Sequence, residues 1–340
     1  MEQTFMIVTI DASPAAQDHA AFGNELRAKT IEDAAAQATM QPWVAMECYQ
    51  LSRGGRVSQM HTLDLGNQRI VQEHQFAAVQ KLGSTPADFC TISYSTPSMA
   101  FRFSDHAASC TESIFFMPER TDFDIYVPAG TQTAYIGFSE REFLEAARAL
   151  NPAAWDLPSR QVSQLQCAQL GELKAALAHW LCTAETAASA GHLLAPDVLR
   201  AIILETVLRV LTASASDETI LPPLSARSRA VKICRMAREY VDERLASHEM
   251  PTIVDICVSL SVSERALLYA FHSYVGMSPQ AYLRLCRLNH VRTTLLAGNP
   301  TTTTVTHAAM QMGFLHLSRF AGDYRQVFEE TPKVTLARRS

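Results

Sequence analysis

Two short stretches in the C-terminal third carry side chains that could hydrogen-bond to the edges of nucleic-acid bases. In the first stretch, Arg265, Tyr269 and His272 recur at helical spacing, and in the second, Ser318 and Arg319 begin a helix-forming run. Arginine can bond two acceptors of guanine at once, and serine can bond several bases. We therefore expect two helices that present polar and basic side chains to a nucleic acid.

Each of these expected helices also has an apolar face that would fix it to the rest of the protein. The apolar residues recur three or four positions apart: Leu267, Phe271 and Val275 in the first stretch, and Phe320, Tyr324 and Phe328 in the second. A helix that enters a DNA major groove must be held on one face and polar on the other. The patterning predicts that arrangement twice.

The surrounding sequence repeats the same plan of short helix, turn and longer helix. Thr252, Ile253, Ile256 and Cys257 match Thr304, Val305, Ala308 and Ala309 at an offset of 52, and Leu267, Phe271, Val275, Ser278 and Pro279 match Phe320, Tyr324, Phe328, Thr331 and Pro332 at an offset of 53. The repeat predicts two helix-turn-helix units. Residues 278–297 would form a connecting helix of roughly 30 Å, close to one turn of DNA at ~34 Å.

Charge is distributed unevenly along the chain. The net charge is −5, but residues 226–340 contain 15 Lys and Arg against 9 Asp and Glu, whereas the remainder contains 14 against 25. A basic C-terminal third on an acidic body fits one surface that binds phosphates and another that repels them.

The N-terminal part is predicted to be mostly β-structure. Short apolar or alternating runs between residues 44 and 137 include "VAMECYQ", "RIVQEHQ" and "DFCTISYS", with turn signals such as "SRGGR" and "VPAGT" between them. This spacing predicts an antiparallel sandwich or barrel. Ser139 and Glu142 form a capping-box pattern that starts a helix over "EREFLEAARAL".

The sequence predicts four segments, and the fold class is α+β. They are a β-rich domain at 1–160, a helical segment at 161–214, a polar linker at 215–229 and an all-helical domain at 230–340. Apolar stripes in the helical segment pack either on their own domain or in a dimer.

The C-terminal third resembles the AraC family of bacterial transcription regulators. The resemblance covers about 110 residues and is carried by "DICVSLSVSERALLYAFHSYVGMSP", "RLCRLNHVR" and "AAMQMGFLHLSRFAGDYRQVFEETP". Within that family, "RLNHVR" and "HLSRFAGDY" look like the branch of the ethanolamine-operon regulator. The N-terminal part looks generally like a cupin-like regulatory domain.

The resemblance implies a set of DNA-contacting residues. It implies base-edge contacts from Arg265, Leu268 and Tyr269 in the first unit and from Ser318, Arg319 and Gly322 in the second, with His272 beside the first set. Arg287 and Arg292 on the connecting helix would contact phosphate or serve a structural role. Two positions depart from the family: Gly322 replaces a longer side chain, and Glu330 is expected to replace a glycine in the second turn.

Catalytic and metal-binding signatures are not found in the sequence. His61, His74 and His106 stand alone, without the His-x-His pair that a cupin metal site needs. No Gly-x-Ser-x-Gly, Walker A or dinucleotide motif occurs. The eight cysteines form no Cys-x-x-Cys pair and are expected to be buried apolar residues. We therefore expect no enzymatic activity, no cofactor and no metal.

The expected function is sequence-specific transcription regulation in the cytoplasm. Double-stranded DNA and a small-molecule effector are the expected partners. RNA polymerase and a homodimer follow from the family, and activation and repression both stay open. No run of 18 apolar residues predicts a membrane span, and the first residues do not form a signal peptide. The alternatives are a cupin-type metalloenzyme fused to a DNA anchor, and an architectural DNA binder without sequence preference.

Overall fold

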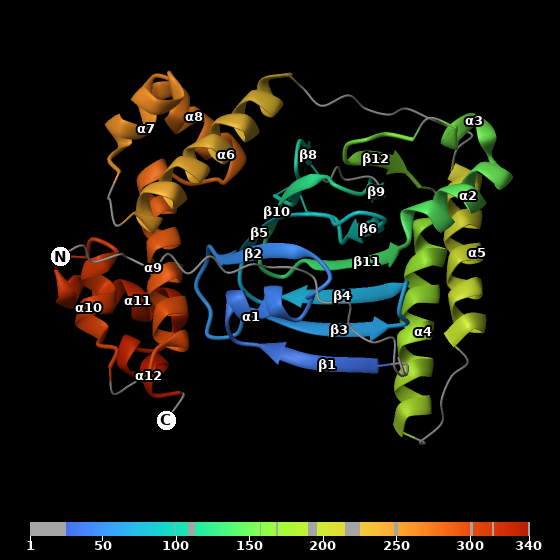
Figure 1. Ribbon diagram of the computed structural model, residues 1–340, viewed down its shortest axis with the longest axis horizontal. Helices are drawn as coiled ribbons and strands as arrows, with labels where there is room; N and C mark the ends of the chain where they lie inside the picture. The colour runs from blue at the N-terminus through green and yellow to red at the C-terminus, as the bar shows by residue number, and fades with distance from the viewer. Residues whose placement is uncertain are drawn as a thin grey trace, which may run out of the picture.

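The N-terminal part of the protein is built on two antiparallel sheets that pack face to face (Figure 1). The computed structural model describes residues 25–98, 100–107, 113–156, 158–167, 169–189, 196–214, 225–247, 251–299, 302–314 and 316–338. In these residues the two sheets stay separate. Of the sandwich and barrel alternatives, the structure therefore has the sandwich.

The larger sheet has seven strands and the smaller has five. The seven-stranded sheet has the order β1 (Glu25–Ile31), β3 (Ser58–Asp64), β4 (Arg69–Gln75), β11 (Gln132–Phe138), β6 (Cys90–Ser95), β9 (Ser113–Met117) and β12 (Ser163–Gln166). The five-stranded sheet has the order β2 (Ala45–Gln50), β5 (Val79–Ser84), β10 (Asp122–Val127), β7 (Arg102–Phe103) and β8 (His106–Ala107).

The larger sheet is buried on both faces. One face packs against the smaller sheet around Met60, Val71 and Phe115. The other face packs, around Ile70 and Phe116, against four helices, which are α2 (Glu140–Leu150), α3 (Pro152–Trp155), α4 (Leu170–Ser189) and α5 (Pro196–Ser214). Strand β9 is buried at all five positions. This double burial accounts for its continuous apolar sequence.

Some predicted elements are confirmed and others are corrected. Ser139 caps α2, as predicted, by accepting a hydrogen bond from the backbone N–H of Glu142. Strand β1 was not predicted from the sequence, and β3 lies within the predicted β region but outside the runs that were singled out there. Residues 163–166 were predicted to be helical, but they form β12, which pairs with β9. Pairing with β9 gives the backbone N–H and C=O groups of β12 their hydrogen-bond partners. The apolar pattern of the sequence alone does not reveal such a pairing.

The C-terminal third is entirely helical. Its helices are α6 (Ser225–Ala246), α7 (Ile253–Leu260), α8 (Glu264–Tyr274), α9 (Pro279–Ala297), α10 (Val305–Gln311), α11 (Leu317–Phe328) and α12 (Pro332–Ala337). The predicted linker is shorter than expected, because residues 225–229 belong to α6. Its other residues, 215–224, lie outside the described part of the chain.

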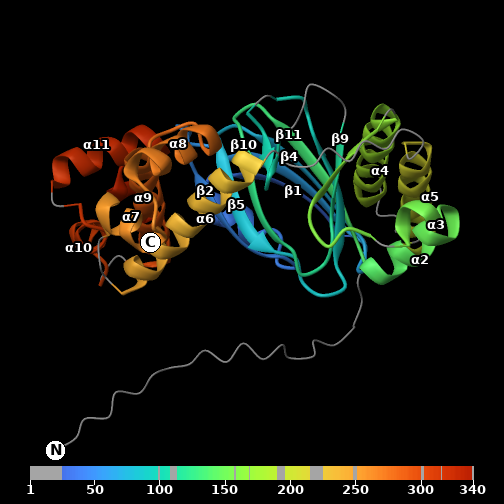
Figure 2. The ribbon, with the colours of Figure 1, turned by 90° about the horizontal axis from the view of Figure 1, so that it is seen from above.

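The helices occupy both ends of the sandwich. In Figure 2, α6–α11 lie at one end and α2–α5 at the other. The apolar stripes of α4 and α5 pack in one cluster with the larger sheet, so they serve their own domain. The C-terminal helices contain two apolar clusters. The cluster around Leu267, Phe271 and Tyr282 also includes Tyr49 of β2 and Leu51, which directly follows that strand.

Candidate nucleic-acid interface

The two predicted helix-turn-helix units are formed by α7–α8 and α10–α11, with α9 between them. In the first unit, Thr252 caps α7, Ser261 adopts the left-handed conformation in the turn (φ 54°), and Ser263 caps α8. In the second, Thr304 caps α10, and Gly313 supplies the left-handed position of the turn (φ 71°). These caps satisfy backbone N–H groups that a helix start leaves unpaired. The duplication predicted from residue offsets is confirmed.

We call α8 and α11 the recognition helices. The predicted apolar faces are buried: Leu267, Phe271 and Val275 on or next to α8, and Phe320, Tyr324 and Phe328 on α11. The ring of Phe320 packs on Phe314 from the turn, with ring centroids 4.9 Å apart. Aromatic burial of this kind holds each recognition helix against α9 or its neighbours.

The opposite faces of both recognition helices are open to solvent. Tyr269 is 66% exposed, and the other exposed positions predicted to contact DNA are Arg265, Leu268, His272, Ser318, Arg319 and Gly322. Figure 2 shows α8 and α11 along the same edge of the C-terminal domain, with α7 and α10 below them. One nucleic-acid duplex could therefore approach both helices from one side.

His316 occupies the N-cap position of α11. Its side chain is exposed and makes no capping hydrogen bond. The sequence left open whether this histidine caps the helix or contacts DNA. The structure therefore rules out capping of α11 by the His316 side chain.

Arginines cluster where α9 meets α11. Arg284 forms an ion pair with Asp323 of α11, and the guanidinium of Arg287 lies 5.1 Å from the ring centroid of Phe314. Burial lowers the pKa of Arg284, and the positive charge of Arg319 lowers it further. Burial and Arg284 likewise lower the pKa of Arg287. Because these cations repel one another, an anion such as a phosphate would be stabilised here. Arg284 and its ion pair with Asp323 were not predicted from the sequence.

Arg292 of α9 is buried, whereas Arg284 and Arg287 are partly exposed. It is 2% exposed, and its guanidinium forms ion pairs with Asp33 of the N-terminal domain and with Glu330. Its pKa is raised; burial opposes that shift, while the charges of Tyr324, Asp33 and Glu330 favour it. Of the phosphate and structural roles that the sequence left open, these contacts support the structural one.

The second turn differs from the sequence expectation by one position. The left-handed residue is Glu329 (φ 58°), which aligns with Gly276 (φ 76°) at the offset of 53. Glu329, not Glu330, therefore occupies the glycine position. Glu330 follows it and accepts hydrogen bonds from Arg292, Thr335 and Arg338.

Replacing Gly322 by alanine is expected to stabilise α11. An added Cβ at Gly322 would meet nothing within 4 Å, and glycine inside a helix costs roughly 0.5–1 kcal/mol relative to alanine. Urea denaturation should therefore show a raised midpoint. As a control, Gly298→Ala should be destabilising, because its Cβ would lie 2.6 Å from the hydroxyl of Thr303. A lowered midpoint for Gly322→Ala would contradict the open environment of this residue.

A second candidate site lies between the two sheets. It is a cavity of about 70 Å³ with a mostly apolar lining that includes Phe101, Phe103 and Met117. Its polar lining includes a buried ion pair between Lys81 and Glu73. The side-chain amide of Gln41 donates to Glu73 at 3.0 Å, and the hydroxyl of Tyr135 donates to Gln41 at 2.8 Å. The site therefore has an apolar body and a polar group whose charges are already paired.

Among the described residues, no group of three or more His, Cys, Asp or Glu side chains is placed to hold a metal ion. None of the described helices is long and apolar enough to span a membrane.

The C-terminal third of the chain is similar to known proteins. Residues 256–338 match the family described as "Helix-turn-helix domain". The "Probable thc operon regulatory protein" of Rhodococcus erythropolis is 34% identical over 105 residues, which cover 31% of this chain and 31% of that protein. The "XylDLEGF operon transcriptional activator 2" of Pseudomonas putida is 42% identical over 78 residues, covering 22% of this chain and 48% of that protein.

A solved structure also matches this region. It is a probable AraC family transcriptional regulator from Rhodopseudomonas palustris, with 35% sequence identity and a TM-score of 0.29, and the match covers 32% of this chain and 96% of that chain. The chain spans between 30% and 39% of the length of the first three curated relatives that it matches. Residues 256–338, which match the helix-turn-helix family, contain both recognition helices.

Proposed function

We propose that this chain is a sequence-specific DNA-binding transcription regulator of the AraC type, because its C-terminal third matches a helix-turn-helix family and is similar to bacterial operon regulators. The observation that carries the proposal is the paired geometry of α8 and α11. Each helix is held by a buried aromatic face and presents an exposed polar face on the same side of the domain. Two such helices fit successive major grooves on one face of a duplex.

The connecting helix sets the distance between the two recognition helices. Helix α9 has 19 residues, which gives it a length of about 28 Å at 1.5 Å per residue. This length is close to the ~34 Å of one DNA turn. We infer that Arg265, Leu268 and Tyr269 contact bases in one groove and that Ser318, Arg319 and Gly322 contact the next. Leu268 and Tyr269 would make apolar contacts, such as with a thymine methyl group.

Phosphate contacts would position these helices. His272 is exposed on α8 and Arg287 is partly exposed on α9, so both can reach the DNA backbone from the recognition side. Arg284, whose pKa is lowered by burial and by the neighbouring charge of Arg319, is a further candidate. Contacts of this kind fix register and carry no base sequence.

Arg319→Ala is expected to weaken specific binding by ~1–3 kcal/mol if Arg319 bonds to a base. The site would first be selected from random duplexes with the full chain, and affinities would then be measured by fluorescence anisotropy at fixed salt. Arg325→Ala is the matched control, because Arg325 is exposed on α11 but lies six residues further along, on another face.

An equal loss of affinity on unrelated duplexes would assign Arg319 to phosphate instead. The same experiment addresses the architectural alternative. A regulator should prefer its own site by roughly 10³-fold or more, whereas equal affinity of the unaltered chain for all duplexes would reject the proposed function.

We infer that the N-terminal domain binds a small-molecule effector in the cavity between the sheets. The lining supports a small, largely apolar molecule with one uncharged polar group, since Lys81 and Glu73 already neutralise each other. A charged ligand would leave one member of this buried pair uncompensated. The metalloenzyme alternative predicts metal that co-purifies with the full chain, which elemental analysis would detect.

Further partners follow from the family. We propose RNA polymerase as a partner and the cytoplasm as the location. A homodimer is also proposed, and α5 offers exposed apolar residues for it: Val198 is 59% exposed and Ile202 is 45% exposed. The closer likeness to the ethanolamine-operon branch stays a prediction.

A further inference from the structure

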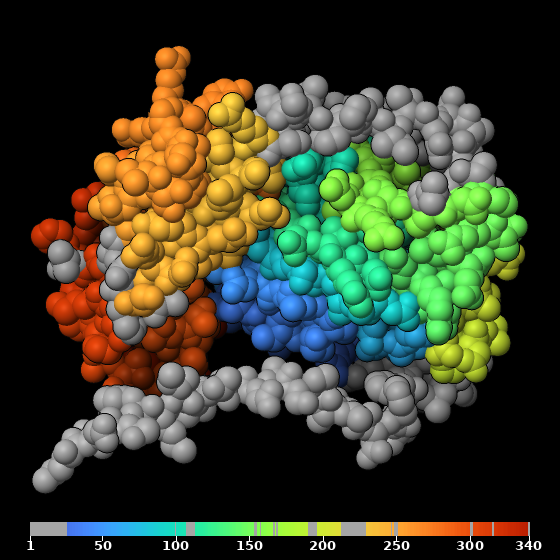
Figure 3. All heavy atoms as spheres, turned by 45° about the horizontal axis from the view of Figure 1, so that its top comes forward, coloured from blue at the N-terminus to red at the C-terminus, as the bar shows by residue number. Residues whose placement is uncertain are grey.

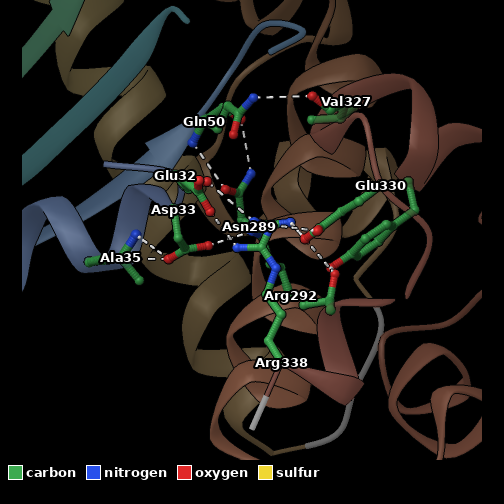
Figure 4. Close-up of polar contacts among 12 residues, drawn as sticks. Glu32, Asp33, Ala35, Gln50, Asn289, Arg292, Val327, Glu330 and Arg338 are labelled. Atoms are coloured by element: carbon green, nitrogen blue, oxygen red, sulfur yellow. Dashed lines mark hydrogen bonds and ion pairs between the residues drawn. The ribbon is translucent and has the colours of Figure 1, made fainter. Parts of the chain in front are cut away.

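The second helix-turn-helix unit is held against the N-terminal domain by a group of charged side chains, of which Arg292, Asp33 and Glu330 are largely buried. Figure 4 shows Arg292 of α9 between Asp33 and Glu330, with Arg338 bonded to Glu32 and Glu330. Asp33 and Glu32 belong to the N-terminal domain, whereas Glu330 directly follows the C-cap of α11. The end of a recognition helix is thus tied to the N-terminal domain through one guanidinium.

The N-terminal domain also contacts the last turn of α11 directly. The side-chain amide of Gln50 and the backbone N–H of Gly54 both donate to the carbonyl oxygen of Val327, at 3.1 and 3.0 Å. Asn289 of α9 exchanges two hydrogen bonds with the backbone of Gln50. The carbonyls at the end of a helix lack partners within the helix. Here the N-terminal domain supplies some of them.

Asp33 has a second role inside its own domain. Its Oδ1 atom caps the short helix α1 (Ala34–Thr39) by accepting from the backbone N–H groups of Ala35 and Ala36, at 2.9 and 3.2 Å. Its Oδ2 atom contacts the Nε of Arg292. Because one carboxylate makes both contacts, a shift of α1 moves the partner of Arg292 as well.

The other end of α1 leads into the cavity between the sheets. The backbone N–H of Gln41 donates to the carbonyl of Ala38, and the side chain of Gln41 joins Glu73 and Tyr135 in the cavity lining. Gln41 is 2% exposed, so it cannot exchange these partners for bulk water. A molecule that enters the cavity and displaces this amide must therefore move Gln41 and the end of α1.

We propose that α1 is a relay that couples the state of the cavity to the position of the second recognition helix, with Asp33 as its positioning residue. The path runs from Glu73 and Gln41 through α1 to Asp33, then to Arg292 and Glu330 at the end of α11. Arg292 is almost completely buried, so the loss of Asp33 would leave its charge poorly compensated. Because of that cost, the ion pair between Asp33 and Arg292 is sensitive to small displacements of α1.

Amide hydrogen exchange of the full chain tests the relay without an identified effector. Gln41→Leu keeps the side-chain size and removes the hydrogen bonds to Glu73 and Tyr135. We expect exchange at residues 325–330 to become roughly 5–30-fold faster, as for the loss of one or two buried hydrogen bonds. In an Asp33→Ser background, which keeps an N-cap but is too short to reach Arg292, the Gln41→Leu effect should vanish.

Control variants separate the relay from general destabilisation. Glu32→Gln removes the surface ion pair with Arg338 but lies outside the proposed path, so the Gln41→Leu effect should persist in that background. Tyr135→Phe deletes only the hydroxyl that donates to Gln41 and should give a smaller change in the same direction if Gln41→Leu fails to fold.

Two outcomes would overturn the relay. One is faster exchange in α1 with no change at residues 325–330. The other is an equal Gln41→Leu effect in the presence and absence of Asp33. The relay rests on the proposed function for its biological role, but the exchange measurement involves no DNA. An intact relay with no sequence-specific binding would reject the function alone, and specific binding without coupling would reject the relay alone.

Discussion

Arg292→Leu should lower the free energy of unfolding by about 3–5 kcal/mol, the usual cost of breaking a buried ion pair by removing one partner. The change deletes the cation that compensates Asp33 and Glu330, whose side chains are each only 10% exposed. It also removes the contact between the guanidinium and the ring of Phe328. Urea denaturation followed by circular dichroism would measure the change.

Arg338→Gln provides the matched comparison for Arg292→Leu. Arg338 forms ion pairs with the same Glu330 and with Glu32, but its side chain is 39% exposed. Exposed ion pairs contribute about 0–1 kcal/mol, so the control should have little effect. Equal losses for the two variants would show that burial does not decide the contribution of Arg292.

Phe320→Ala is expected to disrupt the second helix-turn-helix unit while the first stays folded. Phe320 is 1% exposed and belongs to the apolar cluster of the second unit, whose buried residues differ from those of the first. Truncation of a buried phenylalanine costs about 3–5 kcal/mol. Amide exchange should accelerate in α10 and α11 but not in α8. Specific DNA affinity should fall toward the nonspecific level, ~10³-fold or more.

The control for Phe320→Ala lies on the same helix. Gln326 is exposed, so Gln326→Ala should leave the exchange of α11 unchanged. If Phe320→Ala instead accelerated exchange equally in α8 and α11, the two units would unfold together. If specific affinity survived a disordered α11, the first unit alone would account for binding, and the paired-groove proposal would be wrong.

The recognition helices were predictable from sequence because their signals are local. Apolar positions spaced three or four apart, capping residues such as Ser263 and a second copy at a fixed offset identify the same elements independently. The spacing therefore predicts buried positions for Leu267 and Phe320, and both are buried. Apolar or alternating runs such as "RIVQEHQ", which forms β4, were recognised for the same reason.

Features that depend on long-range contacts were missed. Strand β3 alternates weakly and carries His61 and Thr62, so its pattern resembles a loop until it pairs with β1 and β4. The partners of Arg292 lie 259 and 38 residues away in the chain. Nothing in the residue type of Asp33 distinguishes an ion-pair partner from an ordinary helix cap. Proximity of this kind is set by the packed structure, which a single sequence does not encode locally.

The two parts of the protein lie in direct contact (Figure 3), and they share an apolar cluster in their interior. Tyr49 and Leu51 contribute to the same packed interior as Phe271 and Tyr282. A chimaera that joined this C-terminal domain to the N-terminal domain of another protein would have to transplant the end of β2 as well, or expose aromatic and aliphatic side chains to water. Exchange of specificity between relatives is therefore better attempted by grafting the outward faces of α8 and α11 than by fusing whole halves.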